Sequence, residues 1–290
     1  MKTKIITVAA ALVVLAGLVI LLYPVVSNMR FRSEQQELID YYEEQIQQTP
    51  PEQVNTMLEL CREYNRDLLE SKVKLTDPFD ESANEMDAHP YIDLLNQNGD
   101  GAMGFIDIPS IKCKLVVYHY TDPDVLAKGI GHLQGTSLPV GGEGTHSVLS
   151  GHTGTADKEF FTNIDQLNEG DVFYLHMVGE TFAYQVEGKS VVLPNETEGL
   201  YIERGRDLVT LVTCTPYGVN THRLLVRGTR IDYDEAQIIV DNTENVIVNT
   251  WLSQYIYAVL IGIAISAVVI AVIFVVYRRV NSENKKEQSP

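Results

Sequence analysis

The chain has 290 residues, of which 45% are apolar and 21% are charged, enough to bury one sizeable hydrophobic core. Its net charge of −17 argues against a nucleic-acid partner, because phosphate backbones are bound by basic surfaces. The three cysteines are an odd number, so they exclude a complete disulfide framework and leave at least one thiol free.

Two long uncharged runs predict membrane-spanning helices. Residues 5–26 and residues 256–277 form runs of 22 residues each, and about 20 apolar residues suffice to cross a bilayer as a helix. No Ala-x-Ala cleavage site follows the first run, and the run is longer than the apolar part of a signal peptide, which favours an uncleaved anchor. We therefore expect spans over residues 5–26 and 255–277.

Basic residues next to these runs predict the orientation of the chain. Lys2 and Lys4 precede the first run, and four basic residues follow the second: Arg278, Arg279, Lys285 and Lys286. Because basic flanks stay on the inner side of a membrane, the tails 1–4 and 278–290 should be cytoplasmic. The protein is then expected in the cell membrane, with both termini inside and the segment between the spans extracellular.

Two helices are predicted between the first span and the main domain, over residues 27–71. Residues 30–48 place four apolar side chains on one helical face: Leu38, Ile39, Tyr42 and Ile46. Thr49 followed by Glu52 has the spacing of a capping box, which predicts the start of a second helix that ends near Ser71. The apolar face of that second helix contains Val54, Met57, Leu58 and Cys61.

Residues 72–100 lack periodicity and are rich in Asp, Asn, Pro and Gly, which predicts a long loop. Asn96, Asn98 and Asp100 have the spacing that opens a calcium loop, but the closing Glu is missing. We therefore expect a turn there, with no bound metal and no cofactor.

The main domain, residues 101–233, should consist mainly of β-strands, and residues 234–254 should form a linker to the second span. Short runs of β-branched and aromatic residues recur between turn signals. They predict eight strands, over residues 105–108, 114–120, 146–149, 172–177, 181–186, 189–193, 208–213 and 223–231. Eight strands without long intervening helices indicate a closed or nearly closed barrel.

Cys214 lies where a predicted strand ends, and its position suggests chemistry. A thiol with an ordinary pKa of about 8.5 is mostly protonated at neutral pH, so a reactive cysteine needs a positive partner. Arg223 starts the next predicted strand, and the two residues lie at the same edge of the barrel if these strands pair as antiparallel neighbours. A general acid or base is also needed, and three histidines could supply it: His146, His152 and His222.

Two segments resemble the sequence signatures of sortases. Residues 210–228, TLVTCTPYGVNTHRLLVRG, are similar to the family's active-site segment, and residues 150–154, SGHTG, are similar to its histidine segment. The resemblance covers about residues 100 to 233. It implies an eight-stranded sortase barrel, with Cys214, His152 and Arg223 as catalytic residues, and it selects His152 among the three histidines.

The resemblance also implies a reaction and a subclass. Cys214 would attack the Thr carbonyl of an LPXTG-like sorting signal, and an amino group would then take the acyl chain from the thioacyl-enzyme. Asp77-Pro78-Phe79 lies ahead of the barrel and resembles the Asp-Pro-aromatic lid of class C sortases, which polymerise pilins. This indicates lid residues at Asp77 and Phe79, and as partners the membrane and secreted pilins or surface proteins with such signals.

Three other functions are alternatives to that of a pilin polymerase. A wall-anchoring sortase would use the same chemistry with a peptidoglycan amino group as acceptor. An L,D-transpeptidase also uses Cys, His and Arg, but its His-Gly-Cys-x-Arg arrangement is absent from this sequence. A non-enzymatic envelope protein that binds peptides would not need Cys214, His152 and Arg223 together.

Overall fold

The computed structural model describes residues 2–71, 73–80, 90–153, 155, 158–243, 255–257, 259–264 and 268. The chain divides into two units, Met1–Ile247 and Val248–Pro290. No helix among the described residues is both long and apolar enough to cross a membrane. The predicted first span lies among the described residues, within a helix, and is not confirmed as a span. Most of the predicted second span and the whole tail 278–290 lie outside the described residues, so this span stays a prediction.

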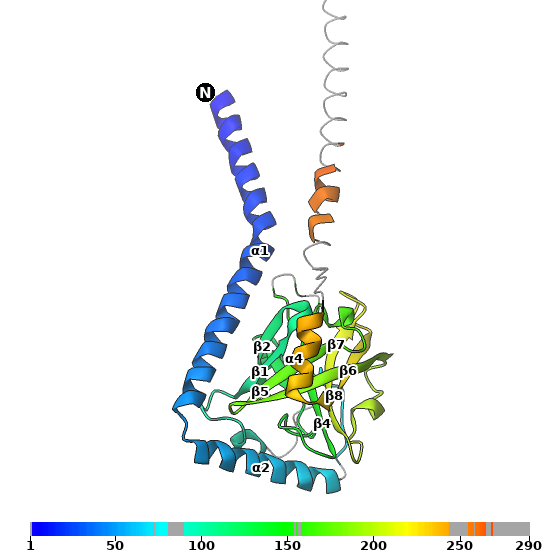
Figure 1. Ribbon diagram of the computed structural model, residues 1–290. Helices are drawn as coiled ribbons and strands as arrows, with labels where there is room; N and C mark the ends of the chain where they lie inside the picture. The colour runs from blue at the N-terminus through cyan, green and yellow to red at the C-terminus, as the bar shows by residue number, and fades with distance from the viewer. Residues whose placement is uncertain are drawn as a thin grey trace, which may run out of the picture. The chain divides into compact units, whose positions relative to one another are not determined.

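The described part of the first unit contains a closed barrel of eight strands (Figure 1). Around the barrel the order is β1-β2-β3-β4-β7-β8-β6-β5, and the pairing of β1 with β5 closes it. The strands are β1 (Ala102–Ile108), β2 (Cys113–His119), β3 (Ile130–His132), β4 (Thr145–Ser150), β5 (Val172–Met177), β6 (Glu180–Val192), β7 (Asp207–Thr215) and β8 (His222–Ile231). The predicted mainly β fold and eight-stranded barrel are thus confirmed.

The eight observed strands are not the eight predicted ones. The predicted strands 181–186 and 189–193 are one strand, β6, whose pairing with β8 shifts register between Val186 and Gly188. Gly188 interrupts the residue pattern without ending the strand, because a bulge absorbs the extra residue. The prediction missed β3, which has only three residues and is held parallel to β2 and antiparallel to β4.

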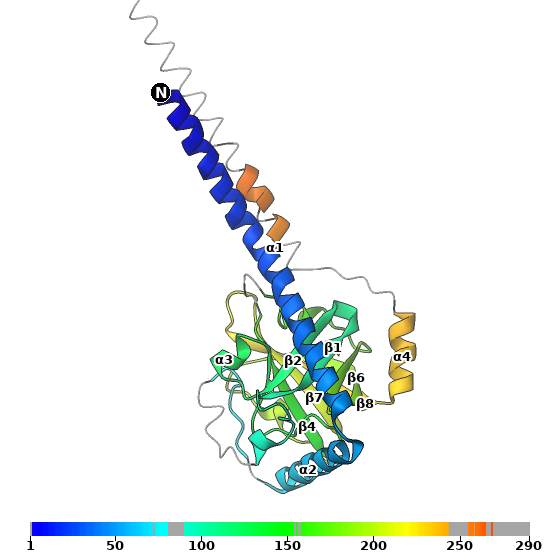
Figure 2. The ribbon, with the colours of Figure 1, turned by 90° about the vertical axis from the view of Figure 1, so that its left-hand side faces the viewer.

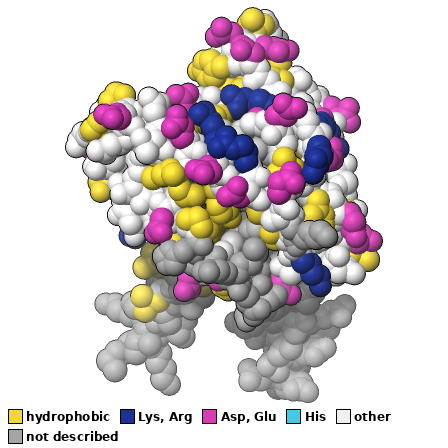
Figure 3. Space-filling view, turned by 90° about the horizontal axis from the view of Figure 1, so that it is seen from below, with side chains coloured by type: hydrophobic (Ala, Val, Ile, Leu, Met, Phe, Trp, Pro, Cys, Tyr) yellow, Lys and Arg dark blue, Asp and Glu magenta, His cyan; other side chains and the backbone are white. Residues whose placement is uncertain are grey.

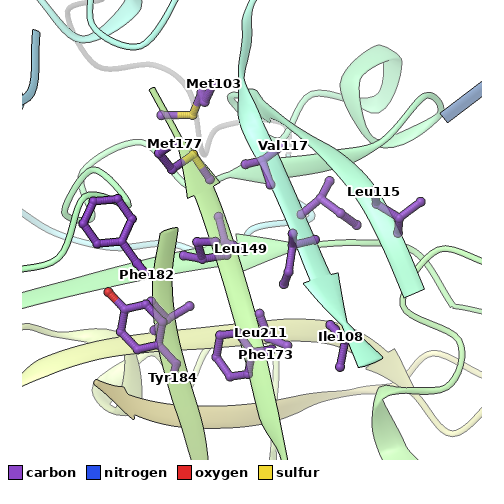
Figure 4. Close-up of a cluster of buried hydrophobic side chains, with 14 of the residues drawn as sticks. Met103, Ile108, Leu115, Val117, Leu149, Phe173, Met177, Phe182, Tyr184 and Leu211 are labelled. Carbon is purple, nitrogen blue, oxygen red and sulfur yellow. The ribbon is translucent and has the colours of Figure 1, made fainter. Parts of the chain in front are cut away.

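The barrel interior is filled by alternate side chains of the strands (Figure 4). Phe173 of β5 and Tyr184 of β6 stack there, with ring centroids 5.6 Å apart. Gly228 of β8 lies against this pair, and a Cβ atom at its position would stand 2.6 Å from the ring of Phe173. A larger residue at 228 would therefore push the aromatic layer apart.

Helix α1 (Lys2–Gln48) is continuous from the first apolar run to the edge of the barrel (Figure 2). It packs on the barrel with a buried stripe of helical spacing: Asn28, Phe31, Gln35, Ile39 and Tyr42. Leu38, predicted on this face, is instead 40% exposed. The prediction counted apolar residues only, whereas two of the five stripe positions carry amides that bind backbone groups of the barrel domain.

Helix α2 (Pro51–Glu70) begins without the predicted capping box. Pro50 occupies the cap position and provides no side-chain cap, and the Thr49 hydroxyl donates to the Gln45 carbonyl of α1. Thr49 therefore closes the preceding helix rather than opening the next. Leu58 and Cys61 are buried as predicted. Asn65 fixes α2 to the barrel through two bonds to the backbone of Leu138, of 2.7 and 3.0 Å.

The segment expected as a linker starts with a helix, α4 (Tyr233–Asn242). Asp232 caps it by accepting a 2.9 Å bond from the Asp234 amide. Ala236 is fully buried in a small apolar cluster with residues of β5 and β6. The chain thus remains attached to the barrel until about residue 243, and the predicted linker beyond it lies outside the described residues.

Acidic and basic side chains are mixed on the face of the molecule seen in Figure 3. In the view of Figure 3, Asp and Glu side chains surround the Lys and Arg side chains of this face. The ion pairs of Arg206 with Glu187 and of Arg227 with Glu203 show the same mixing of charges. Such mixing differs from the continuous basic surfaces that bind nucleic acid.

Candidate active site

Cys214 and Arg223 lie directly opposite each other on neighbouring strands. Strands β7 and β8 pair antiparallel, and Cys214 is in register with Arg223. The predicted pairing of these strands is therefore confirmed. Because directly opposed residues in such a pair have their Cβ atoms about 5 Å apart, the thiol and the guanidinium share one edge of the barrel.

His152 follows β4, the other neighbour of β7. Strand β4 runs parallel to β7, with Ser150 in register with Val212, so the chain reaches His152 beside the end of β7. The Gly151 amide donates to the Val212 carbonyl at 3.1 Å, and the Thr213 hydroxyl donates to the Gly151 carbonyl at 2.7 Å. A Cβ atom at Gly151 would stand 2.6 Å from Cδ1 of Ile130 and 2.9 Å from the ring of Phe161, so a larger residue would have to displace these two side chains.

The other two candidate histidines are placed differently. His146 is fully buried, and its ring nitrogens pair with the Tyr201 carbonyl at 2.8 Å and the Thr210 hydroxyl at 2.7 Å. His222 starts β8 and pairs with the hydroxyl of its neighbour Thr221. Both bonds of His146 are internal to the fold, which suits a structural role.

The tripeptide Asp77-Pro78-Phe79, here called the lid tripeptide, lies against this edge. The Asp77 carboxylate accepts two bonds from the Arg223 guanidinium, 2.8 Å from Nε and 2.5 Å from Nη2. The Phe79 ring centroid lies 5.0 Å from Cζ of Arg223 and 5.8 Å from the ring of His152. The lid tripeptide therefore contacts two of the three predicted catalytic side chains.

Leu75, upstream of the lid tripeptide, also holds this segment, and no local sequence pattern indicates it. Leu75 is 6% exposed and packs in an apolar cluster with Leu133, Val148, Leu200, Val212 and Leu225. Its amide donates to the Tyr201 hydroxyl at 3.2 Å, and its carbonyl accepts from the Thr197 hydroxyl at 3.5 Å. The segment is thus tied to the connection between β6 and β7 as well as to Arg223.

The guanidinium of Arg223 is well supplied with acceptors in this arrangement. Its Nη1 donates to the carbonyls of Asn220 and His222, each at 3.2 Å, while Nε and Nη2 face Asp77. The two charged side chains are 12% and 13% exposed. With the lid tripeptide in place, Arg223 therefore has little capacity left to bind another group.

The surroundings of the site favour the uncharged forms of the thiol and the imidazole. Burial raises the pKa of Cys214; the nearby Arg223 lowers it, and Asp77 raises it further. Burial lowers the pKa of His152. Asp77 thus opposes the effect that a guanidinium would otherwise have on the thiol, and the lid-covered site holds less thiolate than an open one.

Of the residues that the structure describes, no cluster of three or more His, Cys, Asp or Glu side chains could hold a metal ion. Sequence reasoning did not identify Phe160, whose ring lies 6.1 Å from that of His152.

The sequence matches a known family model, and the fold matches those of solved structures. The Sortase domain family model matches residues 106–231. Sortase C of Streptococcus pneumoniae is 38% identical, with a TM-score of 0.62, and the match covers 68% of this chain and 97% of that chain. Sortase C-1 of Actinomyces oris is 45% identical, with a TM-score of 0.56, and the match covers 62% and 99% of the two chains.

Sequence relatives point the same way. Sortase D of Bacillus subtilis is 29% identical over 133 residues, 45% of this chain and 64% of that protein. The chain thus spans less than two thirds of the curated relatives that it matches. A closed barrel of this order, with high identity to whole solved domains, defines a sortase-type domain. The chain belongs to the sortase family, and among solved structures it groups with sortase C.

Proposed function

We propose that this protein is a pilin-polymerising sortase. It would cleave an LPXTG-like sorting signal after Thr and join that Thr to a Lys side chain of the next pilin subunit. The observation that carries this proposal is the double hydrogen bond between Asp77 and Arg223, which places an Asp-Pro-aromatic tripeptide over the candidate site. The solved sortase C of Streptococcus pneumoniae is described in terms of pilin substrate specificity, which supports the same assignment.

The proposed reaction has two acyl transfers. The Cys214 sulfur attacks the Thr carbonyl carbon, and the negative charge that develops on the carbonyl oxygen is stabilised by Arg223. His152 takes the proton of the Cys214 thiol as the sulfur attacks and gives that proton to the departing Gly amine, so that a C–S bond replaces the C–N bond. The incoming Lys amine then attacks the thioester, loses its proton to His152 and releases the Cys214 sulfur.

The lid tripeptide must leave before this reaction starts. The same guanidinium N–H groups that bind Asp77 are those that a substrate carbonyl or oxyanion requires, so the two uses exclude each other. A carboxylate matches the guanidinium fork well, which makes Asp77 an effective competitor. Opening of the lid tripeptide would free Arg223 and remove Phe79 from His152.

Mass spectrometry of the products tests the acceptor. We expect the full-length enzyme in detergent, given candidate pilins together with a peptidoglycan cross-bridge peptide, to form pilin–pilin isopeptides. A pilin with its acceptor Lys replaced by Arg is the control, and it should not be extended. A product that carries the cross-bridge peptide instead would make the protein a wall-anchoring sortase, since the two products differ in mass.

The proposed location is the cell membrane, with spans over residues 5–26 and 255–277 and the catalytic domain outside. Protease added to intact protoplasts is expected to digest the segment between the spans while tags at both termini survive, because the basic flanks keep the tails inside. Permeabilised cells are the control, in which both tags should be lost. Loss of the C-terminal tag from unbroken cells would contradict the topology.

A further inference from the structure

Three residues of helix α1 contact Glu159 and Phe160, which follow His152 in the chain. Asn28 accepts a 3.1 Å bond from the Glu159 amide, and Arg32 forms an ion pair with the Glu159 carboxylate. Phe31 packs edge-on against Phe160, with ring centroids 4.9 Å apart. Asn28 and Phe31 are buried, so these contacts belong to the interior of the domain.

The same loop residues lie next to His152. The Phe161 amide, directly after Phe160, donates to the His152 carbonyl at 2.9 Å. The ring of Phe160 stands edge-on to the His152 ring, with 6.1 Å between centroids. Phe160 therefore joins α1 on one side to the imidazole on the other.

Glu159 ties the residues beside His152 to one particular side chain of α1, Arg32. Its side chain is only 5% exposed, while the Arg32 side chain is 49% exposed. One carboxylate oxygen, Oε1, has no hydrogen-bond partner among the described residues, and a cavity of about 170 Å³ lies between Arg32, Glu159 and Cys113. Because a buried ion pair often adds little to the free energy of unfolding, the pair of Glu159 with Arg32 is better explained as a contact that fixes the position of Glu159.

We propose that Asn28, Phe31 and Arg32 of α1 are positioning residues for His152, acting through Glu159 and Phe160. The catalytic use of His152 rests on the proposed function, whereas the positioning concerns the ring itself. The helix that continues toward the proposed first span would thus set the orientation of the imidazole. A helix displaced along its axis would move Glu159 and Phe160 with it.

The test compares Arg32→Met with a control on the same helix. Gln35, one turn further along α1, accepts a bond from the Val116 amide and donates to the Lys128 carbonyl, and neither bond involves the His152 loop. Gln35→Met should therefore weaken the packing of α1 on the barrel while the contacts of α1 with Glu159 and Phe160 stay in place. Arg32→Met alone leaves the buried Glu159 carboxylate without its partner and could unfold the domain. The double variant Arg32→Met/Glu159→Gln removes that charge as well, so it should fold.

Two measurements on the full-length protein in detergent decide the question. The first is the NMR titration of the His152 imidazole, assigned with His152→Gln. Burial lowers the pKa of His152, so the Arg32 variants, in which Glu159 beside Phe160 loses its ion pair with α1, should raise it toward the ordinary histidine value. The second is cleavage of a sorting-signal peptide, in which kcat should fall about tenfold with KM unchanged, because small misplacements of a catalytic group are costly.

The outcomes separate this proposal from the proposed function. Arg32→Lys, which keeps the charge, should restore part of kcat, and Gln35→Met should lower the unfolding temperature while leaving both readouts unchanged. If the Arg32 variants and Gln35→Met move the titration equally, or none moves it, the positioning role is wrong. If the wild type cleaves no sorting signal, the proposed function fails, and the titration still decides the positioning.

Discussion

Cys214→Ala is expected to abolish cleavage and transfer, with a loss of at least about 10⁴-fold in turnover, because no other group in the site can form the thioester. The fold should survive. The Cys214 side chain is partly exposed at the barrel edge, so loss of one sulfur atom should change the free energy of unfolding by less than about 1 kcal/mol. Peptide cleavage followed by chromatography measures the first effect, and thermal unfolding measures the second.

Cys61→Ala is the matched control for this variant. Cys61 is fully buried between α2 and the barrel, and burial raises the pKa of its thiol to about 12, so it holds almost no thiolate at neutral pH. Its replacement should leave turnover unchanged and lower stability by about 1 kcal/mol through lost packing. Wild-type cleavage by Cys214→Ala would remove the thiol from the proposed mechanism.

The sequence predicted the parts of the site that depend on local patterns. Strand periodicity placed Cys214 at the end of one strand and Arg223 at the start of the next, and the register of β7 and β8 agrees. His152 was harder, since residue chemistry alone left His146 and His222 as equal candidates. Only the family resemblance separated them, because the burial and bonding of His146 arise from tertiary contacts with Tyr201 and Thr210.

The failed predictions share a physical cause. The capping box at Thr49 and Glu52 is a correct local rule, but the turn between α1 and α2 gives the Thr49 hydroxyl another acceptor in Gln45. The buried stripe of α1 was predicted correctly at Ile39 and Tyr42, but Asn28 and Gln35 were missed because they are polar. A buried side-chain amide is stable only where it finds a hydrogen-bond partner. The partners of these two amides are backbone N–H groups 81 or more residues away in the sequence. Hydrophobic periodicity cannot detect such pairs.

The short strand β3 and the contacts of the lid tripeptide also depend on partners that are distant in the sequence. Three residues carry too little pattern to identify a strand, and β3 exists because β2 and β4 supply its partners. Only the family resemblance indicated the lid tripeptide; Pro78 restricts its own φ and biases Asp77 toward an extended conformation, which is also true of an ordinary Asp-Pro turn. The anchoring of Leu75 by Tyr201 and Thr197 depends on the loop between β6 and β7, and no local signal indicates it.

Replacement of both lid side chains is expected to expose Cys214. Asp77→Ala/Phe79→Ala removes two charge-assisted bonds to Arg223 and a ring that contacts both Arg223 and His152. If these contacts hold the lid tripeptide closed by about 2 kcal/mol, the double variant should react about 30-fold faster with a small thiol reagent. Loss of Asp77 and better hydration also lower the pKa of Cys214, which adds thiolate at neutral pH.

The labelling experiment has its controls in the same chain. Cys214→Ala gives the background from Cys61 and Cys113, which should be small because burial raises both pKa values to about 12. Lys74→Ala changes an exposed residue of the same segment and should label at the wild-type rate. Bulky reagents should gain at least as much as small ones, because an open lid tripeptide enlarges access as well as reactivity. If the double variant folds normally and labels Cys214 no faster than wild type, Asp77-Pro78-Phe79 is an ordinary turn, and a wall-anchoring role becomes as well supported as pilin polymerisation.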